Sequence, residues 1–386
     1  SNSVTAQGNT DANGNGDFYH SPPTGFLALC SKNLPDPTIK LSNKYFGTLL
    51  WTGNATAPRT ISDTSIVNFT PGWVWVKCRS NTHDHQLTDA LRGTSKAITS
   101  NTTGGEIDWD TEYSGNNKGM GDYVNGGFIL DDNGNNARFN QNSQTFVAWN
   151  WYADTSTVSN TDGSITSSVR ASTVAGFSMA TWTSDGSGSP SSFGHGLGVK
   201  PDFLIIMNRS SSGNKQCWSK HFTNATNDFI SLNLTDGKQT AGAAMWGTID
   251  SSVVNFRHSA NSSNGNSMIG YFFSSVAGYS KFGSYTSNGN AEGTFVFLGF
   301  KPALVIFKNM SSTEAWSMFD NQRDPDNPVE KFLRPSGNDA DTSGSNDIDF
   351  TANGFKCRTT NNPNVSTNTY IYLAWAESPF KYARAR

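Results

Sequence analysis

Charged residues are scarce in this chain of 386 residues: they make up 15% of it, against roughly 25% in an average soluble domain. The net charge is -3 and basic residues form no cluster, so the composition lacks the electrostatic footprint of a nucleic-acid-binding protein. No run approaches the ~18 consecutive apolar residues that a membrane-spanning helix needs. We therefore expect no nucleic-acid partner and no membrane insertion.

Cysteine is also rare, and the spacing of the cysteines matches no metal-binding pattern. The four cysteines lie far apart, at Cys30, Cys78, Cys217 and Cys357, without a CxxC or Cys/His pattern, so a zinc site is not expected. Cys78 and Cys357 fall in predicted strands, where a cysteine serves as a small buried hydrophobe. Free thiols are therefore favoured over two disulfides.

Aromatic and turn-forming residues are abundant instead. The chain has 11 Trp, 11 Tyr and 25 Phe, which pack well on β-sheets, and it has 37 Gly. Asn and Gly accept the left-handed backbone angles of turns. This composition predicts an all-β protein with long Asn/Ser/Gly-rich loops, in which only Leu87–Leu91 is expected to form a helical turn.

A threefold internal repeat is the strongest signal in the sequence. Residues 69–77, 198–208 and 299–309 each carry a proline (Pro71, Pro201 and Pro302) followed by four to six apolar residues. Proline lacks the N–H that a sheet needs and so belongs at the start of a strand. The apolar runs predict strands that are buried on both faces.

Two further patterns accompany each proline. An alternating strand ending in aromatic-Thr precedes it, at Trp51, Trp182 and Tyr285, and an aromatic-rich strand follows it. In that later strand we align Trp149, Tyr271 and Trp375 as core residues. Between these patterns, residues 218–222 align with residues 316–320.

The repeat predicts three tandem antiparallel β-sandwich modules, lectin-like or jelly-roll-like in character. The expected boundaries are an N-terminal extended segment (1–40) and modules at 41–165, 166–279 and 280–386. The N-terminal segment is expected to be a docking strand on the first module or the end of an upstream domain.

Candidate metal sites are few. His83, Asp84 and His85 lie near Asp89 and Arg92, but a solvated loop with an Asp89–Arg92 ion pair is the preferred interpretation. Acidic stretches at 131–136, 320–327 and 338–341 offer oxygen ligands for calcium, yet turn chemistry explains them more simply. We therefore assign no metal ligand.

Catalytic signatures are missing as well. The sequence has no Gly-x-Ser-x-Gly, Walker, His-Glu-x-x-His or dinucleotide-binding pattern. We assign no catalytic or cofactor-binding residue and expect no enzyme and no cofactor. Trp51, Trp182 and Tyr285 end strands beside turns, where they could stack against sugars, although packing at the sandwich rim is the favoured role.

The N-terminal residues 14–39, which include Asp17-Phe-Tyr-His-Ser-Pro-Pro-Thr-Gly-Phe-Leu-Ala-Leu-Cys30, resemble a stretch of tailed-phage tail-fibre and virion surface proteins. In those proteins this stretch closes a SPRY-like domain. Residues 88–93 and 146–151 and the terminal residues 370–382 resemble the repeated modules of the same proteins. The resemblance implies a structural or adhesive role on a bacteriophage particle and supplies no catalytic residues.

We therefore expect a virion surface protein, such as a tail fibre, adhesin or capsid decoration, outside the cell. Its partners would be other virion proteins and host cell-surface polysaccharide, touched by loops on a stiff β frame. Three sandwiches in a row would act as a rigid spacer, and avidity favours a homo-oligomer, most simply a trimer. A bacterial secreted lectin or adhesin, and a polysaccharide depolymerase, are the alternatives.

Overall fold

Nearly all regular structure in the chain is β-strand. The computed structural model describes residues 7–33, 37–111, 117–132, 136–186, 191–257 and 265–377. These contain 27 strands and two 3₁₀ turns, η1 (Ser31–Asn33) and η2 (Ser42–Lys44). Across the described ranges, no helix has the length and apolar character needed to cross a membrane. The all-β prediction is confirmed.

The expected helical turn at Leu87–Leu91 is wrong. Gln86–Asp89 forms strand β4, and all four of its residues are buried. Both faces of β4 are therefore covered by other parts of the protein. A strand in a sheet between two cores can be buried on both faces, whereas an isolated helical turn cannot.

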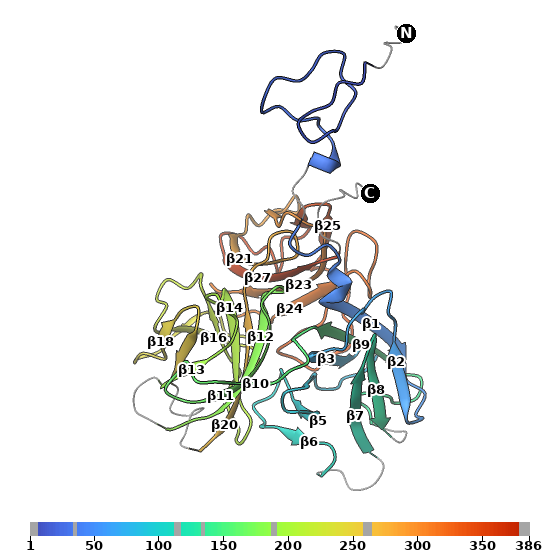
Figure 1. The fold of residues 1–386 in the computed structure, drawn as a ribbon. Coiled ribbons are helices and arrows are strands. Elements are labelled where there is room, and N and C mark those ends of the chain that lie inside the picture. Colours follow the sequence, from blue (N-terminus) through green and yellow to red (C-terminus); the bar gives the residue numbers. More distant parts are fainter. Residues whose placement is uncertain are drawn as a thin grey trace.

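The strands fall into three groups along the chain, which we call modules 1, 2 and 3 (Figure 1). Module 1 contains β1 (Phe46–Thr52), β2 (Arg59–Ser62), β3 (Trp73–Cys78), β4 (Gln86–Asp89), β5 (Gly93–Ile98), β6 (Ile107–Asp108), β7 (Asn117–Val124), β8 (Gly127–Asp132) and β9 (Thr145–Trp151). Module 2 contains β10 (Val158–Asn160), β11 (Ser167–Ser172), β12 (Phe177–Thr183), β13 (Ser191–Gly194), β14 (Phe203–Asn208), β15 (Gln216–Ser219), β16 (Asp228–Ser231), β17 (Gln239–Thr240), β18 (Trp246–Ile249), β19 (Val253–Phe256) and β20 (Ser267–Phe273). Module 3 contains β21 (Ser280–Thr286), β22 (Phe295–Phe297), β23 (Pro302–Asn309), β24 (Ser317–Asp320), β25 (Ile348–Thr351), β26 (Gly354–Cys357) and β27 (Thr369–Ala376).

Each module is built from one large and one small antiparallel sheet. The large sheets have the orders β1-β9-β3-β4-β5-β6, β10-β11-β12-β20-β14-β15-β16-β17 and β21-β27-β23-β24. The small sheets are β2-β8-β7, β13-β19-β18 and β22-β26-β25. A core of four strands has the same order in all three large sheets: β1-β9-β3-β4, β12-β20-β14-β15 and β21-β27-β23-β24. Strand β10, which precedes the expected boundary at residue 166, pairs within the sheet of module 2.

Strand register shows which residues are equivalent. The proline-led strands β3, β14 and β23 all lie between the last strand of the module and a following hairpin strand, as the repeat predicted. Trp51, Trp182 and Tyr285 pair with Phe146, Met268 and Tyr370, respectively, and so occupy the same position in the three modules.

Two of the sequence alignments within module 3 are wrong. Trp375 pairs with Leu304 on β23, as Trp151 pairs with Trp73 and Phe273 pairs with Phe203, so Trp375 is equivalent to Trp151 rather than Trp149. A register irregularity between Pro302 and Leu304 shifts the pairing by one residue at the start of β23. Likewise Phe319, not Trp316, is the equivalent of Trp218. Phe319 pairs with Val305 and Trp218 pairs with Leu204, and these two partners each lie three residues after the proline.

Both faces of the large sheets are buried, because alternate side chains of a strand point to opposite faces. In β9, Phe146 and Ala148 face the interior of module 1, whereas Val147, Trp149 and Trp151 face a second core. In β27, Tyr372 and Ala374 face the interior of module 3, while Leu373 and Trp375 face that same second core.

The second core is shared by all three modules. The equivalent residues Trp151, Phe273 and Trp375 meet there, with ring centroids 5.3 Å apart for Trp151–Trp375 and 5.8 Å for Phe273–Trp375. Trp73 of module 1 stacks on Tyr271 of module 2 at 4.5 Å. The modules therefore do not form the expected spacer of sandwiches in a row; they pack around one common core (Figure 1).

Three equivalent contacts close the modules into a ring, and we call these contacts seams. In each, a backbone N–H of one module donates to the carbonyl that follows the proline-led strand of the next. Glu106 N donates to Arg209 O at 2.8 Å (seam 1–2), Lys238 N to Met310 O at 2.9 Å (seam 2–3) and Asp341 N to Arg79 O at 2.7 Å (seam 3–1).

The N-terminal segment is organised around one carboxylate. Asp11 accepts hydrogen bonds from the backbone N–H groups of Asn13, Asn15 and Ala28 and from the amide of Asn33. These bonds lower the pKa of Asp11 to about 2 even though its burial acts in the opposite direction. The segment has one isolated bridge, Asn9–Phe18, and stands apart from module 1 in Figure 1.

Candidate functional site

The three aromatic residues proposed as glycan contacts lie in the module interiors. Trp51, Trp182 and Tyr285 are 8%, 6% and 9% exposed. The Trp51 indole N–H donates to Phe139 O, the Tyr285 hydroxyl donates to Pro363 O, and Trp182 stacks on Phe193 at 3.6 Å. A stacking platform needs an open ring face, so we place no sugar on these residues. Their packing role is the one that the structure displays.

Cys78, Cys357 and the core aromatic residues lie where the strand pattern predicted. Cys78 and Cys357 are buried in β3 and β26, and Cys217 is buried in β15. All four cysteines are free thiols. Trp149, Tyr271 and Trp375 are buried, which confirms their assignment to the core.

The residues around His85 form a buried seam and not a solvated loop. His85 has no exposed surface; it accepts the Trp75 indole N–H at 2.8 Å on Nδ1 and lies 3.0 Å from Arg334 O of module 3. Burial holds the pKa of His85 well below its ordinary value. The expected Asp89–Arg92 ion pair is present at 2.5 Å, with both side chains fully buried.

Asp89 and Arg92 help to join modules 1 and 2. The hydroxyl of Tyr271, from module 2, donates to Asp89 at 2.8 Å, and Arg92 pairs with Glu106 at 3.2 Å. Glu106 in turn pairs with Arg209 of module 2 at 2.8 Å. This chain of buried charges belongs to seam 1–2.

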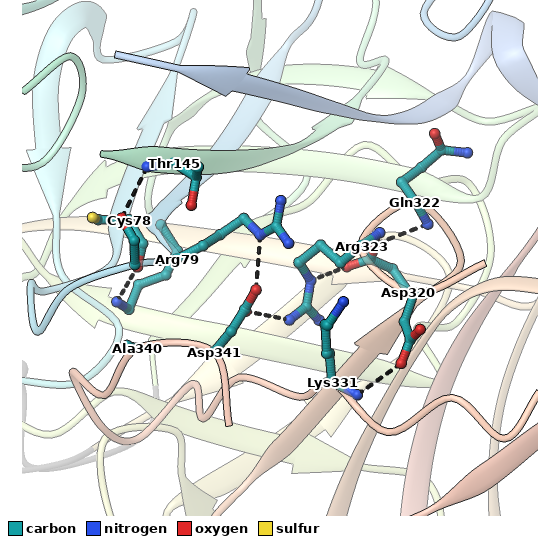
Figure 2. Close-up of polar contacts among 12 residues, drawn as sticks. Cys78, Arg79, Thr145, Asp320, Gln322, Arg323, Lys331, Ala340 and Asp341 are labelled. Atoms are coloured by element: carbon teal, nitrogen blue, oxygen red, sulfur yellow. Dashed lines mark hydrogen bonds and ion pairs between the residues drawn. The ribbon is translucent and has the colours of Figure 1, made fainter. Parts of the chain in front are cut away.

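Seam 3–1 repeats this arrangement with different residues (Figure 2). Asp320 pairs with Arg323 at 2.5 Å, Arg323 with Asp341 at 2.8 Å, and Asp341 with Arg79 of module 1 at 2.8 Å. The Trp149 indole N–H, also from module 1, donates to Asp320 at 3.1 Å. The two networks therefore close two seams.

The acidic stretches considered for calcium are engaged in turns and ion pairs. Asp324 accepts the backbone N–H groups of Glu330 and Lys331, and Asp339 pairs with Arg334. Within the described residues, no group of three or more His, Cys, Asp or Glu side chains is placed to hold a metal ion. Residues 133–135 of the stretch 131–136 lie outside the described residues.

Among the residues that the structure describes, seam 2–3 has no counterpart of the ionic network. Ser219 and Phe222 take the positions that Asp89 and Arg92 hold in module 1, and Leu373 takes the position of Trp149. Phe222 and Leu373 join the shared core. At the surface of this seam lies a groove of about 520 Å³. Its walls come from both modules: Lys220, His221, Ser275, Lys281, Phe282, Gly283, Ser284, Tyr285, Phe295, Val296, Phe297 and Tyr372.

Two exposed phenylalanines distinguish this groove from the corresponding parts of modules 1 and 2. Phe295 and Phe297 of β22 are 46% and 58% exposed, whereas Val296 between them is buried. The register of the small sheets places Thr60 and Ser62 at the same positions in module 1, and Ser192 and Gly194 in module 2. The fold therefore does not require aromatic residues there, and outward rings in module 3 indicate a contact surface.

The polar groups of the groove come chiefly from β21. Lys281 Nζ donates to Phe297 O at 2.7 Å and lies 5.5 Å from the centroid of the Phe297 ring. Gly283 is two residues further along the strand, on the same side. A Cβ at Gly283 would lie 2.4 Å from the hydroxyl oxygen of Tyr372, so this glycine leaves room for that hydroxyl.

Module 2 supplies the opposite wall. His221 lies 3.3 Å from Phe282 O through Nε2 and 3.2 Å from the Ser284 hydroxyl through Nδ1. Burial lowers the pKa of His221, so the imidazole is neutral at pH 7. Lys220 pairs with Asp202 at 2.9 Å. Asn321 and Gln322 are the equivalents of Lys220 and His221 at seam 3–1, where the cleft measures about 140 Å³.

Sequence reasoning missed this groove entirely. The alternation Phe295-Val-Phe297 could have indicated outward rings, but only the register shows that Thr60 and Ser62 are equivalent to them. The contribution of Lys220 and His221 from another module depends on the closed ring, which the repeat pattern does not predict.

Comparison with known proteins identifies one family. Residues 41–379 match the family described as a domain of unknown function (DUF7483). No curated protein and no solved structure matches the chain. The match spans β1 to β27 and so treats the three modules as one unit. The chain therefore belongs to the family described as a domain of unknown function (DUF7483).

Proposed function

We propose that the protein is a structural component of a phage virion surface that contacts host glycans through the groove at seam 2–3. The virion placement rests on the sequence resemblance given above. The glycan contact rests on one observation: Phe295 and Phe297 are exposed where the other two modules carry Thr60, Ser62, Ser192 and Gly194.

The groove has the two kinds of group that sugar recognition uses. Aromatic rings cover the apolar C–H face of a pyranose, and amide, hydroxyl and imidazole groups bond its hydroxyls. Here Phe295 and Phe297 would supply the rings, and His221, Ser284 and Tyr372 the polar partners.

The same lining favours binding over hydrolysis at this place. A glycosidase needs two carboxyl groups on either side of the bond that it cleaves. Among the described residues that line the groove, none is Asp or Glu. The groove thus supports an adhesive role better than the alternative of a depolymerase.

The glycan contact is tested by transplanting the module 1 residues into module 3. We expect the intact chain to bind a subset of a glycan array that spans neutral and acidic bacterial sugars. The Phe295→Thr/Phe297→Ser double variant should lose most of this binding, because it removes the rings. Thr60→Ala/Ser62→Ala, at the equivalent positions of module 1, is the matched control and should bind as the unaltered chain does.

Retention of full binding by the double variant would refute the groove as the contact site, as would the absence of any bound glycan. The virion placement has its own test. Genes for capsid and tail proteins should flank the coding sequence, and a bacterial chromosomal neighbourhood without phage genes would contradict it.

The homotrimer expected from avidity stays a prediction. One chain already presents three equivalent modules around a common core, so the contacts between its modules are satisfied internally. Oligomers would therefore have to form through other surfaces.

A further inference from the structure

The described side chains that line the groove at seam 2–3 carry positive charge but no negative charge. Its described lining residues include two lysines, Lys220 and Lys281, and no carboxylate. Lys220 is neutralised by Asp202, which is also hydrogen bonded to Ser275. Lys281 has no carboxylate partner among the described residues; its ammonium group is held by Phe297 O and faces the Phe297 ring.

One ammonium group is thereby fixed in place with hydrogen-bonding capacity to spare. A lysine ammonium has three N–H donors, and the contact with Phe297 O uses one. The attachment to Phe297 O restricts the side chain before any ligand arrives, which lowers the entropic cost of binding an anion.

A second polar group without a partner lies close by. The Tyr372 side chain is 3% exposed, and its hydroxyl, beside Gly283 in the groove, makes no hydrogen bond within the described part of the chain. Burial raises the pKa of Tyr372 to about 12, so the hydroxyl stays protonated and can donate. A nearly buried donor that opens into a groove is suited to an acceptor on a ligand.

We infer that the groove selects an acidic sugar, with a carboxylate bound by Lys281, a ring oxygen or hydroxyl bound by Tyr372, and the pyranose face on Phe295 and Phe297. This inference rests on the proposed glycan contact and specifies its ligand class. Seam 3–1 does not offer the set, because Gly47 replaces Lys281 in β1 and Asn321 and Gln322 replace the wall from the preceding module. At seam 1–2, Ser178 takes the position of Lys281.

The experiment uses the full chain on an array of uronic-acid and sialic-acid glycans with their neutral counterparts. The strongest ligand is then chemically reduced at its carboxyl group, which converts the acid into a neutral alcohol of the same sugar. We expect reduction to weaken binding at least tenfold, and raising the salt concentration to weaken binding of the acidic form only.

Three variants assign the interaction to residues. Lys281→Gln removes the charge and should lower the affinity for the acidic ligand about tenfold, because one charge-assisted hydrogen bond changes the dissociation constant by about that factor. The affinity for the neutral, reduced ligand should stay the same. Lys281→Arg keeps the charge and should retain most of the affinity. Tyr372→Phe preserves the packing and should lower affinity about fivefold for both ligands.

Equal binding of the acidic and reduced ligands would overturn the acidic-sugar inference while leaving the glycan contact in place. An unchanged affinity of Lys281→Gln for the acidic ligand would overturn it as well. Failure of the unaltered chain to bind any glycan, or binding that survives Phe295→Thr/Phe297→Ser, would instead overturn the glycan contact itself.

Discussion

Seams 3–1 and 2–3 occupy equivalent places in the ring but are built differently. At seam 3–1, Asp320, Arg323 and Asp341 form a buried ionic chain to Arg79 (Figure 2). At seam 2–3, Ser219 and Phe222 take the places of Asp320 and Arg323, and Phe222 packs in the shared core instead of forming an ion pair. In the described part of the chain, the groove of seam 2–3 carries two exposed phenylalanines, whereas no phenylalanine as exposed as these lines the cleft at seam 3–1.

This comparison distinguishes residues that stabilise the closed ring from residues that are available to bind a ligand. Buried ion pairs fix a geometry, since any rearrangement would leave a charge unpaired in the interior. The apolar seam meets its packing needs with Phe222 and Leu373 in the shared core. The exposed rings of Phe295 and Phe297 lie outside that packing, and they depart from the repeat.

The largest effect should come from breaking the ionic seam. Arg323→Phe places the module 2 residue in seam 3–1 and leaves Asp320 and Asp341 without their buried partner. We expect the free energy of unfolding to fall by about 3–5 kcal/mol, measured by urea denaturation. The double variant Asp320→Ser/Arg323→Phe, which carries both residues found in module 2, should lose less free energy of unfolding than the single variant, because it removes the unpaired Asp320 carboxylate.

Arg358→Ala is the control for this prediction. Arg358 pairs with Glu292 at the surface, and such pairs contribute about 0–1 kcal/mol. A cost for Arg323→Phe no larger than that of Arg358→Ala would show that the ionic chain does not hold the seam.

A smaller effect is expected from pH. Burial lowers the pKa of His85 and of His195, so the folded protein keeps both neutral at a pH where the unfolded chain protonates them. Their stabilising effect is complete above pH 6.5 and is lost as the pH falls below it, by up to about 1.4 kcal/mol per pH unit for each histidine. Urea midpoints at pH 7.5, 6.5 and 5.5 measure this loss.

The half-buried His221 of seam 2–3 should contribute less to that pH dependence than the fully buried His85, although burial lowers the pKa of His221 as well. His221→Gln, which installs the residue found at Gln322, should therefore keep nearly the same slope between pH 6.5 and 5.5. A stability that does not change over this range in the unaltered protein would contradict the burial of His85 at seam 3–1.

The smallest effect is expected from the groove. Phe295→Thr/Phe297→Ser should change the free energy of unfolding by less than about 0.5 kcal/mol, because the two rings are largely exposed and the new residues already suit the same positions of module 1. Thermal and urea unfolding measure this. A loss of several kcal/mol would mean that the rings support the fold and were misassigned to a ligand.

The sequence was informative about strands and uninformative about how modules meet. Pro71, Pro201 and Pro302 located three equivalent strands, because proline and a following apolar run act locally. The counterpart of the Asp89–Arg92 pair, Asp320–Arg323, lies at the start of the acidic stretch 320–327, where the turn-like composition conceals it in the sequence. The alignment of Trp375 fails because an Ala-Trp pair occurs in both β9 and β27, but the two pairs lie two residues apart in register.

The groove could not be predicted from any local sequence pattern. Its rings come from β22, its cation from β21 and its imidazole from the turn after β15, and these segments meet only because the ring closes. Strands buried on both faces were predicted, but the second face could have been covered by another chain as well as by another module.

Hydrogen–deuterium exchange with and without the strongest glycan of the array tests the account most directly, because it reports on all three modules at once. We expect the ligand to protect the backbone of residues 281–285, 295–297 and 219–222, and to leave the equivalent residues 47–51 and 59–62 unchanged. Equal protection at all three seams, or protection confined to regions outside seam 2–3, would contradict the claim that the ring binds its ligand at the one seam that departs from the repeat.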